Sequence, residues 1–296
     1  MVARKRKSKL PKTQDVLPEH LNNYVLISDM HVGCQYALCH PDGFELDGGG
    51  MSEPSADQKV LWDRWTEFWN VWVPSVTLGA PYAVVNLGDV IDGVHHNSVT
   101  QITHNVGCQR QHAVKILKPV AQGAVAYYHV RGTEAHVGKS AQEEETVARE
   151  LGAVPDSAGC HARYELWFRV GNDSGGGLVH AMHHIGTTGS SHYESSAVMR
   201  ELTEAFVEAG RWGDEPPRII ARAHRHRHIQ IRIPGGAGDC IGMTTPAWQL
   251  KTPFSHAIAG GRMSQAQIGG CIVRYHRGEL YVRNKVWRGV RPKEVG

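Results

Sequence analysis

Five short apolar runs along the chain each lead into an acidic residue or a histidine. Runs of this length without polar alternation are typical of parallel strands buried on both faces. Ligand sites of open α/β sheets form beyond the carboxyl ends of such strands, so we expect the five following segments to meet at one edge. The runs are 24–27 before Asp29, 83–85 before Asp89, 125–130 before Glu134, 177–182 before His183 and 219–220 before His224.

Other stretches predict helices between these strands. Residues 55–73 place a stripe of large apolar side chains at helical spacing, which favours packing against a sheet. Ser140 with Glu143 three residues later forms a capping-box pattern and predicts a helix over 141–151. A further helix is predicted over 193–209. The stripe in the first helix consists of Leu61, Trp65, Phe68, Trp69 and Trp72.

Gly and Pro are frequent in residues 34–54, which predicts a loop after the first polar pair that could overhang a substrate. Beyond His228 the pattern changes to strand-like runs and a turn at Arg277-Gly278, which favours an antiparallel sheet on the far side of a sandwich. Trp248 lies in a long connection over 246–268, where it either caps the site or fills core, the latter being favoured. The runs cover 228–233, 240–245, 270–276 and 279–286.

Two of the polar segments pair ligands two residues apart, Asp29-Met30-His31 and His224-Arg225-His226. If the chain stays extended there, both side chains of a pair project to the same side and can hold one cation. Mixed carboxylate and imidazole ligands suit Mn, Fe(II), Zn or Ni, whereas Ca and Mg prefer oxygen ligands. A carboxylate such as Asp89 can bridge two ions, an arrangement used in phosphate chemistry. We therefore expect phosphoester hydrolysis by a metal-bound hydroxide.

The order of these segments resembles the calcineurin-like metallophosphoesterases, a family of two-metal phosphatases, phosphodiesterases and nucleases. The resemblance covers roughly residues 24–228 and rests on Asp-x-His, Gly-Asp-x-x-Asp, a third block after Gly132, a histidine after the fourth strand, and His-x-His. Alone, each pattern is more typical of a surface loop, and the joint order is what favours a site. The resemblance implies an α/β sandwich of two mixed β-sheets flanked by helices, with two divalent ions, most simply Mn²⁺. It also implies that Asp29, His31, Asp89 and His226 hold the first metal, and that Asp89, Glu134, His183 and His224 hold the second.

The third block departs from the family. The family has Gly-Asn-His followed by an acid, whereas this chain has Gly132-Thr133-Glu134-Ala135-His136. Our interpretation is that Glu134 supplies the metal oxygen and His136 the proton for the leaving group. The alternative is that Glu134 only orients a water and the second metal is weak. Asp92, in the second block, is a further candidate catalytic residue.

Several neighbouring residues are candidates of lower specificity. The fourth ligand segment contains His183 and His184, and the family pattern favours His183, while His180 fits a packed strand position. His95 or Asn97 could reach a substrate phosphate, and Arg225 with the other arginines near His-x-His could attract an anion. Those arginines equally fit ordinary exposed strand positions; they are Arg218, Arg222, Arg225, Arg227 and Arg232.

Composition and charge set the remaining expectations. The 296 residues are 41% hydrophobic, which permits one α/β domain over 21–296, after a basic arm over 1–20 that we expect to be disordered. Six Lys or Arg lie within residues 1–12, so the formal net charge of +3 becomes −3 without them. There is neither an apolar run of membrane-spanning length nor a signal-peptide pattern, and the six cysteines form no Cys-x-x-Cys pair. We expect a cytoplasmic protein with reduced thiols and no membrane partner.

The substrate is the least determined feature. The basic arm and the arginines slightly favour a nuclease or phosphodiesterase, although a body of charge −3 lacks the broad basic face expected for duplex DNA. A serine/threonine-type protein phosphatase is the alternative enzyme. A non-catalytic scaffold of the same fold, which uses its metals to bind a partner, is the alternative from another class. The expected partner is a phosphoester, with nucleic acid among the candidates.

Overall fold

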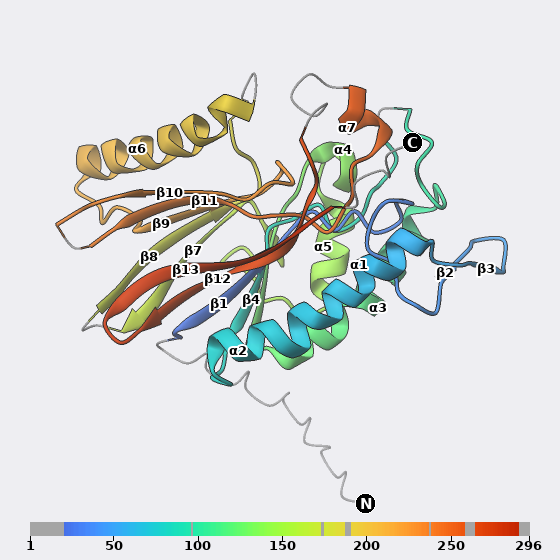
Figure 1. Ribbon diagram of the computed structural model, residues 1–296, viewed down its shortest axis with the longest axis horizontal. Helices are drawn as coiled ribbons and strands as arrows, with labels where there is room; N and C mark the ends of the chain where they lie inside the picture. Colours follow the sequence, from blue (N-terminus) through green and yellow to red (C-terminus); the bar gives the residue numbers. More distant parts are fainter. Residues whose placement is uncertain are drawn as a thin grey trace, which may run out of the picture.

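The computed structural model describes residues 21–95, 97–172, 175–186, 191–236, 238–257 and 264–289. Two β-sheets pack face to face, and helices cover their outer faces (Figure 1). Helix α6 lies over one sheet, and α1, α2, α3 and α5 lie over the other. The predicted architecture of two sheets flanked by helices is therefore present. The predicted basic arm over 1–20 lies outside the described residues.

The larger sheet has six strands in the order β13-β12-β1-β4-β5-β6. Its four strands β1, β4, β5 and β6 run parallel, whereas β12 pairs antiparallel with β1, and β13 pairs antiparallel with β12. Three of the five predicted polar segments thus follow neighbouring parallel strands, those after β1, β4 and β5. The strands are β1 Asn23–Ile27, β4 Ala83–Asn86, β5 Ala126–Val130, β6 Ala162–Arg163, β12 Gln267–His276 and β13 Glu279–Arg288.

The second sheet has five strands in the order β10-β11-β9-β8-β7. Its inner pairs β8·β9 and β9·β11 are parallel, and its outer pairs are antiparallel. The strands are β7 Glu165–Asn172, β8 Gly175–Met182, β9 Ile219–Arg222, β10 Ile229–Ile233 and β11 Cys240–Thr244. A separate hairpin of β2 Phe44–Glu45 and β3 Met51–Ser52 lies within the predicted loop 34–54.

Alternation along the buried strands builds two apolar layers. In β1, Val25 and Ile27 face the helices, whereas Tyr24 and Leu26 face the other sheet, because successive side chains point to opposite faces. The helix-side layer includes Trp248, which is fully buried, so its predicted core position is confirmed. The helices are α1 Ala56–Glu67, α2 Val73–Thr77, α3 Val106–Gly123, α4 Glu134–Val137, α5 Gln142–Glu150, α6 Glu194–Trp212 and α7 Pro253–Ala257.

The helix predicted over 55–73 is confirmed, with a change of geometry near its end. Ser55 caps α1 through a capping box with Gln58. The chain then passes through a π-helical segment, Phe68–Trp72, into α2. The capping box predicted at Ser140 is wrong, because Ala141 has a positive φ of 52° and the Ser140 hydroxyl bonds the side chain of Gln142.

The prediction of one antiparallel sheet after His228 is also wrong. Strands β10 and β11 belong to the smaller sheet, where β11 runs parallel to β9, whereas β12 and β13 belong to the larger sheet. The four runs themselves and the turn at Arg277-Gly278 are present, and both turn residues have positive φ. The strand pairing differs because it depends on contacts far apart in the sequence.

Two further observations concern the chain as a whole. None of the six cysteines is paired with another. Across the helices in the described ranges, none combines the length and apolar character that a bilayer crossing requires.

Candidate metal centre

The segments after β1, β4, β5, β8 and β9 meet at one edge of the sandwich, and backbone hydrogen bonds join them. Asp29 N–H donates to the Gly88 carbonyl at 2.9 Å, and His31 N–H donates to the Asp89 carbonyl at 3.0 Å. In the second sheet, where β8 and β9 are neighbours, Ala223 N–H donates to the His183 carbonyl at 2.9 Å. The polar segments are therefore held in place by the main chain before any side chain is considered.

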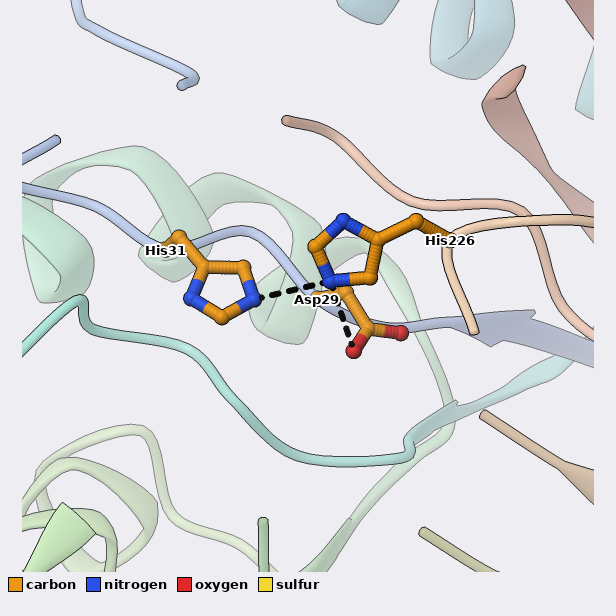
Figure 2. Close-up of side chains that lie close together, drawn as sticks. All are labelled: Asp29, His31 and His226. Carbon is orange, nitrogen blue, oxygen red and sulfur yellow. Dashed lines mark hydrogen bonds and ion pairs between the residues drawn. The ribbon is translucent and has the colours of Figure 1, made fainter. Parts of the chain in front are cut away.

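Asp29, His31 and His226 form what we call the first cluster (Figure 2). Nε2 of His31 lies 3.1 Å from Nε2 of His226, and the latter lies 3.4 Å from Oδ1 of Asp29. Asp29 is fully buried, and its Oδ1 accepts no hydrogen bond within the described residues. Three ligand atoms thus converge on one point, with a buried carboxylate oxygen left unsatisfied.

Asp89, His183 and His224 form what we call the second cluster. Nε2 of His183 lies 3.1 Å from Oδ2 of Asp89, and His183 Nδ1 donates to the Leu87 carbonyl at 2.6 Å, which fixes the ring. The Thr133 hydroxyl lies among all three members, at 3.1 Å from Oδ2 of Asp89, 3.2 Å from His183 and 3.1 Å from Nδ1 of His224. Asp89 also approaches His31 at 4.0 Å and so stands between the two clusters.

Left-handed backbone conformations are concentrated in these clusters. Among the described residues, nine other than glycine have positive φ, and five of them belong to the two clusters. Such conformations cost about 1–2 kcal/mol per residue and persist where the surrounding structure imposes them, often at functional sites. The five are Asp29 (51°), His31 (43°), Asp89 (52°), His224 (69°) and His226 (53°).

This geometry corrects our expectation about the paired segments. Neither Asp29-Met30-His31 nor His224-Arg225-His226 is extended, since both ends of each pair are left-handed. Asp29 and His31 still share one cluster, but His224 and His226 separate, one to each cluster.

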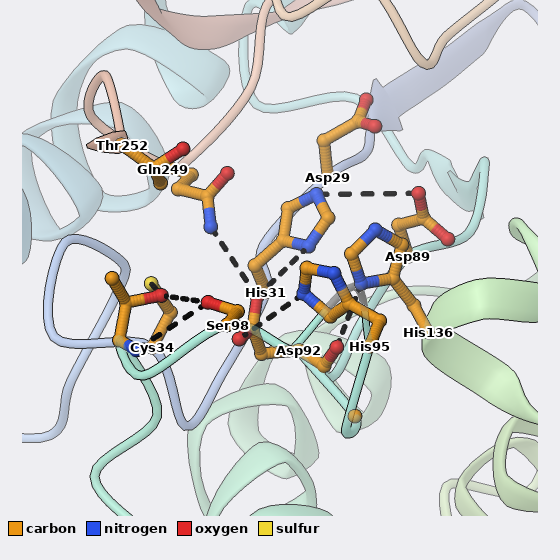
Figure 3. Close-up of polar contacts among 12 residues, drawn as sticks. Asp29, His31, Cys34, Asp89, Asp92, His95, Ser98, His136, Gln249 and Thr252 are labelled. Atoms are coloured by element: carbon orange, nitrogen blue, oxygen red, sulfur yellow. Dashed lines mark hydrogen bonds and ion pairs between the residues drawn. The ribbon is translucent and has the colours of Figure 1, made fainter. Parts of the chain in front are cut away.

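Asp92 lies behind the first cluster and connects it to His136 (Figure 3). Its carboxylate lies 3.5 Å from Nδ1 of His31 and accepts a hydrogen bond from Gln101 Nε2 at 2.6 Å. Its backbone carbonyl accepts a hydrogen bond from Nδ1 of His136 at 2.7 Å. The rings of His31 and His136 meet edge to face, with centroids 4.4 Å apart. Asp92 therefore orients His31 from the nitrogen opposite the first cluster, as carboxylates behind ligating histidines do.

The charges of the clusters shift the ionisation of their members. Burial would lower the pKa of His183, but Asp89 and then Asp29 raise it to about 10. Burial, reinforced by His183, lowers the pKa of His224 to about 4, and burial with His31 lowers that of His136 to about 4. For Asp89, burial opposes ionisation, but His183 and His136 hold its pKa well below the usual range.

Glu144 of α5 supports the two loops behind the second cluster. It is fully buried, and its two carboxylate oxygens accept the N–H groups of Val90 at 3.1 Å and Gly132 at 2.5 Å. The loops touch directly at Gly132, because a Cβ there would lie 2.1 Å from Oδ1 of Asp89. Only glycine fits at this close approach.

Glu134, predicted to supply a metal oxygen, is exposed at the start of α4 and belongs to none of the clusters found among the described residues. Its neighbour Thr133 occupies the second cluster instead. Thr133 directly follows Gly132, where the resemblance places asparagine, so the sequence did contain the signal for this position. No such signal marked three other residues of the site, Glu144, Gln101 and Gln249. The last of these lies 3.5 Å from Asp92.

The remaining candidates lie around the clusters. His183 is buried within the second cluster, whereas the ring of His184 lies beside it at a centroid distance of 5.0 Å. His95 lies 3.6 Å from Asp92 and packs on His136, with ring centroids 4.2 Å apart. Asn97 is exposed, with a positive φ of 51°. His180 stacks on Trp167 in the sheet, in line with its predicted packed position.

The arginines near His-x-His mostly bind the protein itself. Arg225 donates to the Gly186 carbonyl at 2.6 Å. Arg222 is buried against Glu201, and Arg227 contacts Glu194 at 2.7 Å. Arg218 binds backbone carbonyls of Gly176 and Asp239. Their structural use weakens the expectation of a free positive field over the site.

Three features of the first cluster suit a divalent cation. Two imidazole nitrogens that bind one ion at right angles, each at about 2.1 Å, lie about 3 Å apart, which matches the His31–His226 separation of 3.1 Å. The unsatisfied Oδ1 of Asp29 is an available anionic ligand at the same point. The mixed nitrogen and oxygen set suits Mn, Fe, Zn or Ni.

Comparisons with known proteins leave the function open. No family model matches the chain, and no curated protein matches it. Among solved structures, Thermotoga maritima protein TM1076 is similar with a TM-score of 0.34 and 11% identity, covering 90% of this chain and 100% of its own. Vacuolar Protein Sorting 29 from Cryptosporidium parvum is similar with a TM-score of 0.31 and 12% identity, and the match covers 91% of this chain and 100% of that protein. Likenesses of this size carry no functional argument, so the site is interpreted from its own geometry.

Proposed function

We propose that the protein is a metal-dependent phosphoester hydrolase of the calcineurin-like type, acting on phosphodiesters. The observation that carries this proposal is the convergence of the two clusters at Asp89, with five of their six members in left-handed backbone conformations. Strain of this kind at the carboxyl edge of parallel strands is expected where a site is preorganised.

The residues of the first cluster would hold one divalent ion, and those of the second cluster another, with Asp89 between them. Mn²⁺ is the ion we favour, with Fe, Zn or Ni as alternatives. Divalent ions, when bound, supply Lewis acidity that lowers the pKa of a coordinated water and neutralises charge on phosphate oxygens.

His136 is the group we assign to the leaving oxygen. Its Nδ1 is engaged by the Asp92 carbonyl, so Nε2 is the nitrogen left for substrate. Its pKa of about 4 makes the free imidazole neutral near pH 7, with Nε2 unprotonated. The negative charge of an arriving phosphate raises the pKa of a neighbouring imidazole, so Nε2 can take a proton in the complex and donate it as the ester bond breaks.

The test is hydrolysis of bis-p-nitrophenyl phosphate by protein stripped with chelator and reloaded with Mn²⁺. We expect activity that depends on the added ion and falls at least about 10³-fold in Asp89→Asn, because the carboxylate that stands between the two clusters is lost. Asp63→Asn is the matched control, since Asp63 is exposed on α1. Equal rates in Asp89→Asn and Asp63→Asn would refute the proposal.

A non-catalytic metal-binding scaffold is the second candidate. It is favoured by the Thr133 hydroxyl in the second cluster, where the resemblance expects an amide oxygen, and by the exposure of Glu134. This candidate predicts stoichiometric Mn²⁺ in the purified protein without ion-dependent turnover. Elemental analysis together with the diesterase assay separates it from the hydrolase.

A further inference from the structure

Tyr164 is an exposed aromatic residue at the edge where the polar segments meet. It stands between β6 and β7, the strands that form the outer edges of the two sheets, and 73% of its surface is exposed. A tyrosine this exposed contributes little to the core, so its ring is accessible to a ligand.

The strand pairing places Tyr164 beside the second cluster. Strand β6 runs parallel to β5, which leads into Thr133, so Tyr164 follows β6 at the same end of the sheet. On its other side, Glu165 pairs with Met182, the residue before His183. The neighbouring strand in one sheet therefore leads to Thr133, which contacts the second cluster, and in the other to His183, which belongs to it (Figure 1 shows β7 and β8 side by side).

Arg131 supports the ring of Tyr164. Its guanidinium carbon lies 4.3 Å from the ring centroid, within the range of a cation–π contact. Its position is fixed by two hydrogen bonds, from Nε to the Ala162 carbonyl at 2.6 Å and from its backbone N–H to the Arg163 carbonyl at 2.8 Å. Arg131 also stands only two residues before Thr133. The aromatic ring and the positive charge are thus preformed next to the second cluster.

We propose that Tyr164 and Arg131 bind an unpaired nucleobase whose phosphodiester lies at the clusters, which makes nucleotide diesters or single-stranded nucleic acid the substrate class. This inference rests on the proposed function and specifies its substrate. Exposed aromatic rings next to arginine are the usual platform for unpaired bases, and stacking tolerates any base because each has a π-face. Duplex DNA fits less well, because its bases are not free to stack and the chain beyond residue 12 carries a net charge of −3.

The kinetic test uses two esters with the same leaving group, ethyl p-nitrophenyl phosphate and thymidine 5′-p-nitrophenyl phosphate. Only the second carries a base. We expect Tyr164→Ala to lower kcat/KM for the thymidine ester about tenfold more than for the ethyl ester, and Tyr164→Phe to retain the preference. Trp212→Ala removes another exposed ring, at the far end of α6, and leaves both rates unchanged. Equal losses for the two esters in Tyr164→Ala would overturn the inference.

A binding test separates this inference from the hydrolase proposal. Fluorescence anisotropy in chelator measures the affinity for labelled oligothymidylate, for its duplex and, by competition, for thymidine 5′-monophosphate. We expect Tyr164→Ala to weaken oligothymidylate binding about tenfold, even if no ester is hydrolysed. Tighter binding of the oligomer than of the mononucleotide identifies single-stranded nucleic acid as the source of the base, and equal binding identifies nucleotides. Unchanged affinity in Tyr164→Ala, or equal affinity for duplex and single strand, would each contradict the inference.

Discussion

The two clusters that meet at Asp89 differ in how far their polar atoms are already satisfied. In the first cluster, Oδ1 of Asp29 accepts no hydrogen bond within the described residues, and the Nε2 atoms of His31 and His226 face each other. In the second, the Thr133 hydroxyl contacts every member, and the pKa of His183 is raised to about 10. A cation therefore satisfies an unmet ligand in the first cluster, whereas in the second it enters among atoms that already contact the Thr133 hydroxyl. We expect the first cluster to bind its ion more tightly.

The strongest test of this ranking removes one histidine from each cluster. His226→Ala should weaken the tighter Mn²⁺ site by more than about 100-fold, because loss of a direct ligand exceeds the 10–100-fold cost of losing an outer partner. His224→Ala should weaken only the second binding event. Calorimetric titration of the stripped protein measures both. Loss of the tighter event in His224→Ala would reverse the ranking.

The substitution Gly132→Ala should displace the Asp89 carboxylate, which stands between the clusters, without removing a ligand. The added Cβ would lie 2.1 Å from Oδ1 of Asp89, so the two loops have to move apart. We expect diesterase activity to fall about 100-fold, since small displacements of a catalytic group cost this much. Gly210→Ala is the control, because a Cβ there meets nothing within 4 Å in α6 and alanine favours a helix. Comparable rates in the two variants would show that the loops tolerate the change.

The affinity of the second cluster for its ion should depend on pH. The pKa of His183 is about 10, so an ion entering the second cluster displaces one proton, and its affinity should fall about tenfold per unit as the pH is lowered from 8 to 6. In the metal-free protein the same shift stabilises the fold fully below the unfolded pKa of about 6.5, and this contribution is lost as the pH rises toward 10. Mn²⁺ titrations at pH 6, 7 and 8 should show this slope for the weaker binding event. If the affinity of the weaker binding event did not change with pH, the proton on His183 would not be displaced by the ion.

Substitution of Thr133 gives the smallest expected effect and the finest test. Thr133→Asn places an amide oxygen in the second cluster and should strengthen the weaker Mn²⁺ event several-fold, about 1 kcal/mol. Valine has a similar shape to threonine but no hydroxyl, so Thr133→Val should weaken the same Mn²⁺ binding event by a similar factor. Identical affinities in the two variants would show that residue 133 does not contact the ion.

Much of the fold could be predicted from the sequence because its signals are local. The five apolar runs lie in strands that are mostly buried, and their apolar character is visible without distant information. The assignment of β10 to β13 to one sheet failed because pairing is decided by partners such as β9 and β1, which lie far away in the chain. Strand β7 was missed although Glu165–Asn172 alternates between exposed and buried positions over most of its length.

The site could be predicted in its residue types more than in its geometry. The ligand types follow from the strand ends, but the positive φ at His224 and His226 is imposed by tertiary packing, so the backbone geometry of this pair was not foreseen. Glu134 attracted attention as a carboxylate, whereas the helical turn of α4 directs it to solvent and leaves Thr133 inside. The role of Glu144 depends on how α5 packs, which no short pattern contains.

The buried carboxylate of Glu144 has a consequence for how the molecule unfolds. Through the amides of Val90 and Gly132 it links α5 to two loops, one of which lies 54 residues away in the sequence. Opening α5 would leave two amides and a charge without partners, so the helix and both loops are expected to open as one cooperative unit. The amide protons of Val90 and Gly132 should then exchange at the same slow rate as those of α5. Ion binding at the edge of the sandwich would slow amide exchange in α5 and in both loops together, although α5 itself touches no ion.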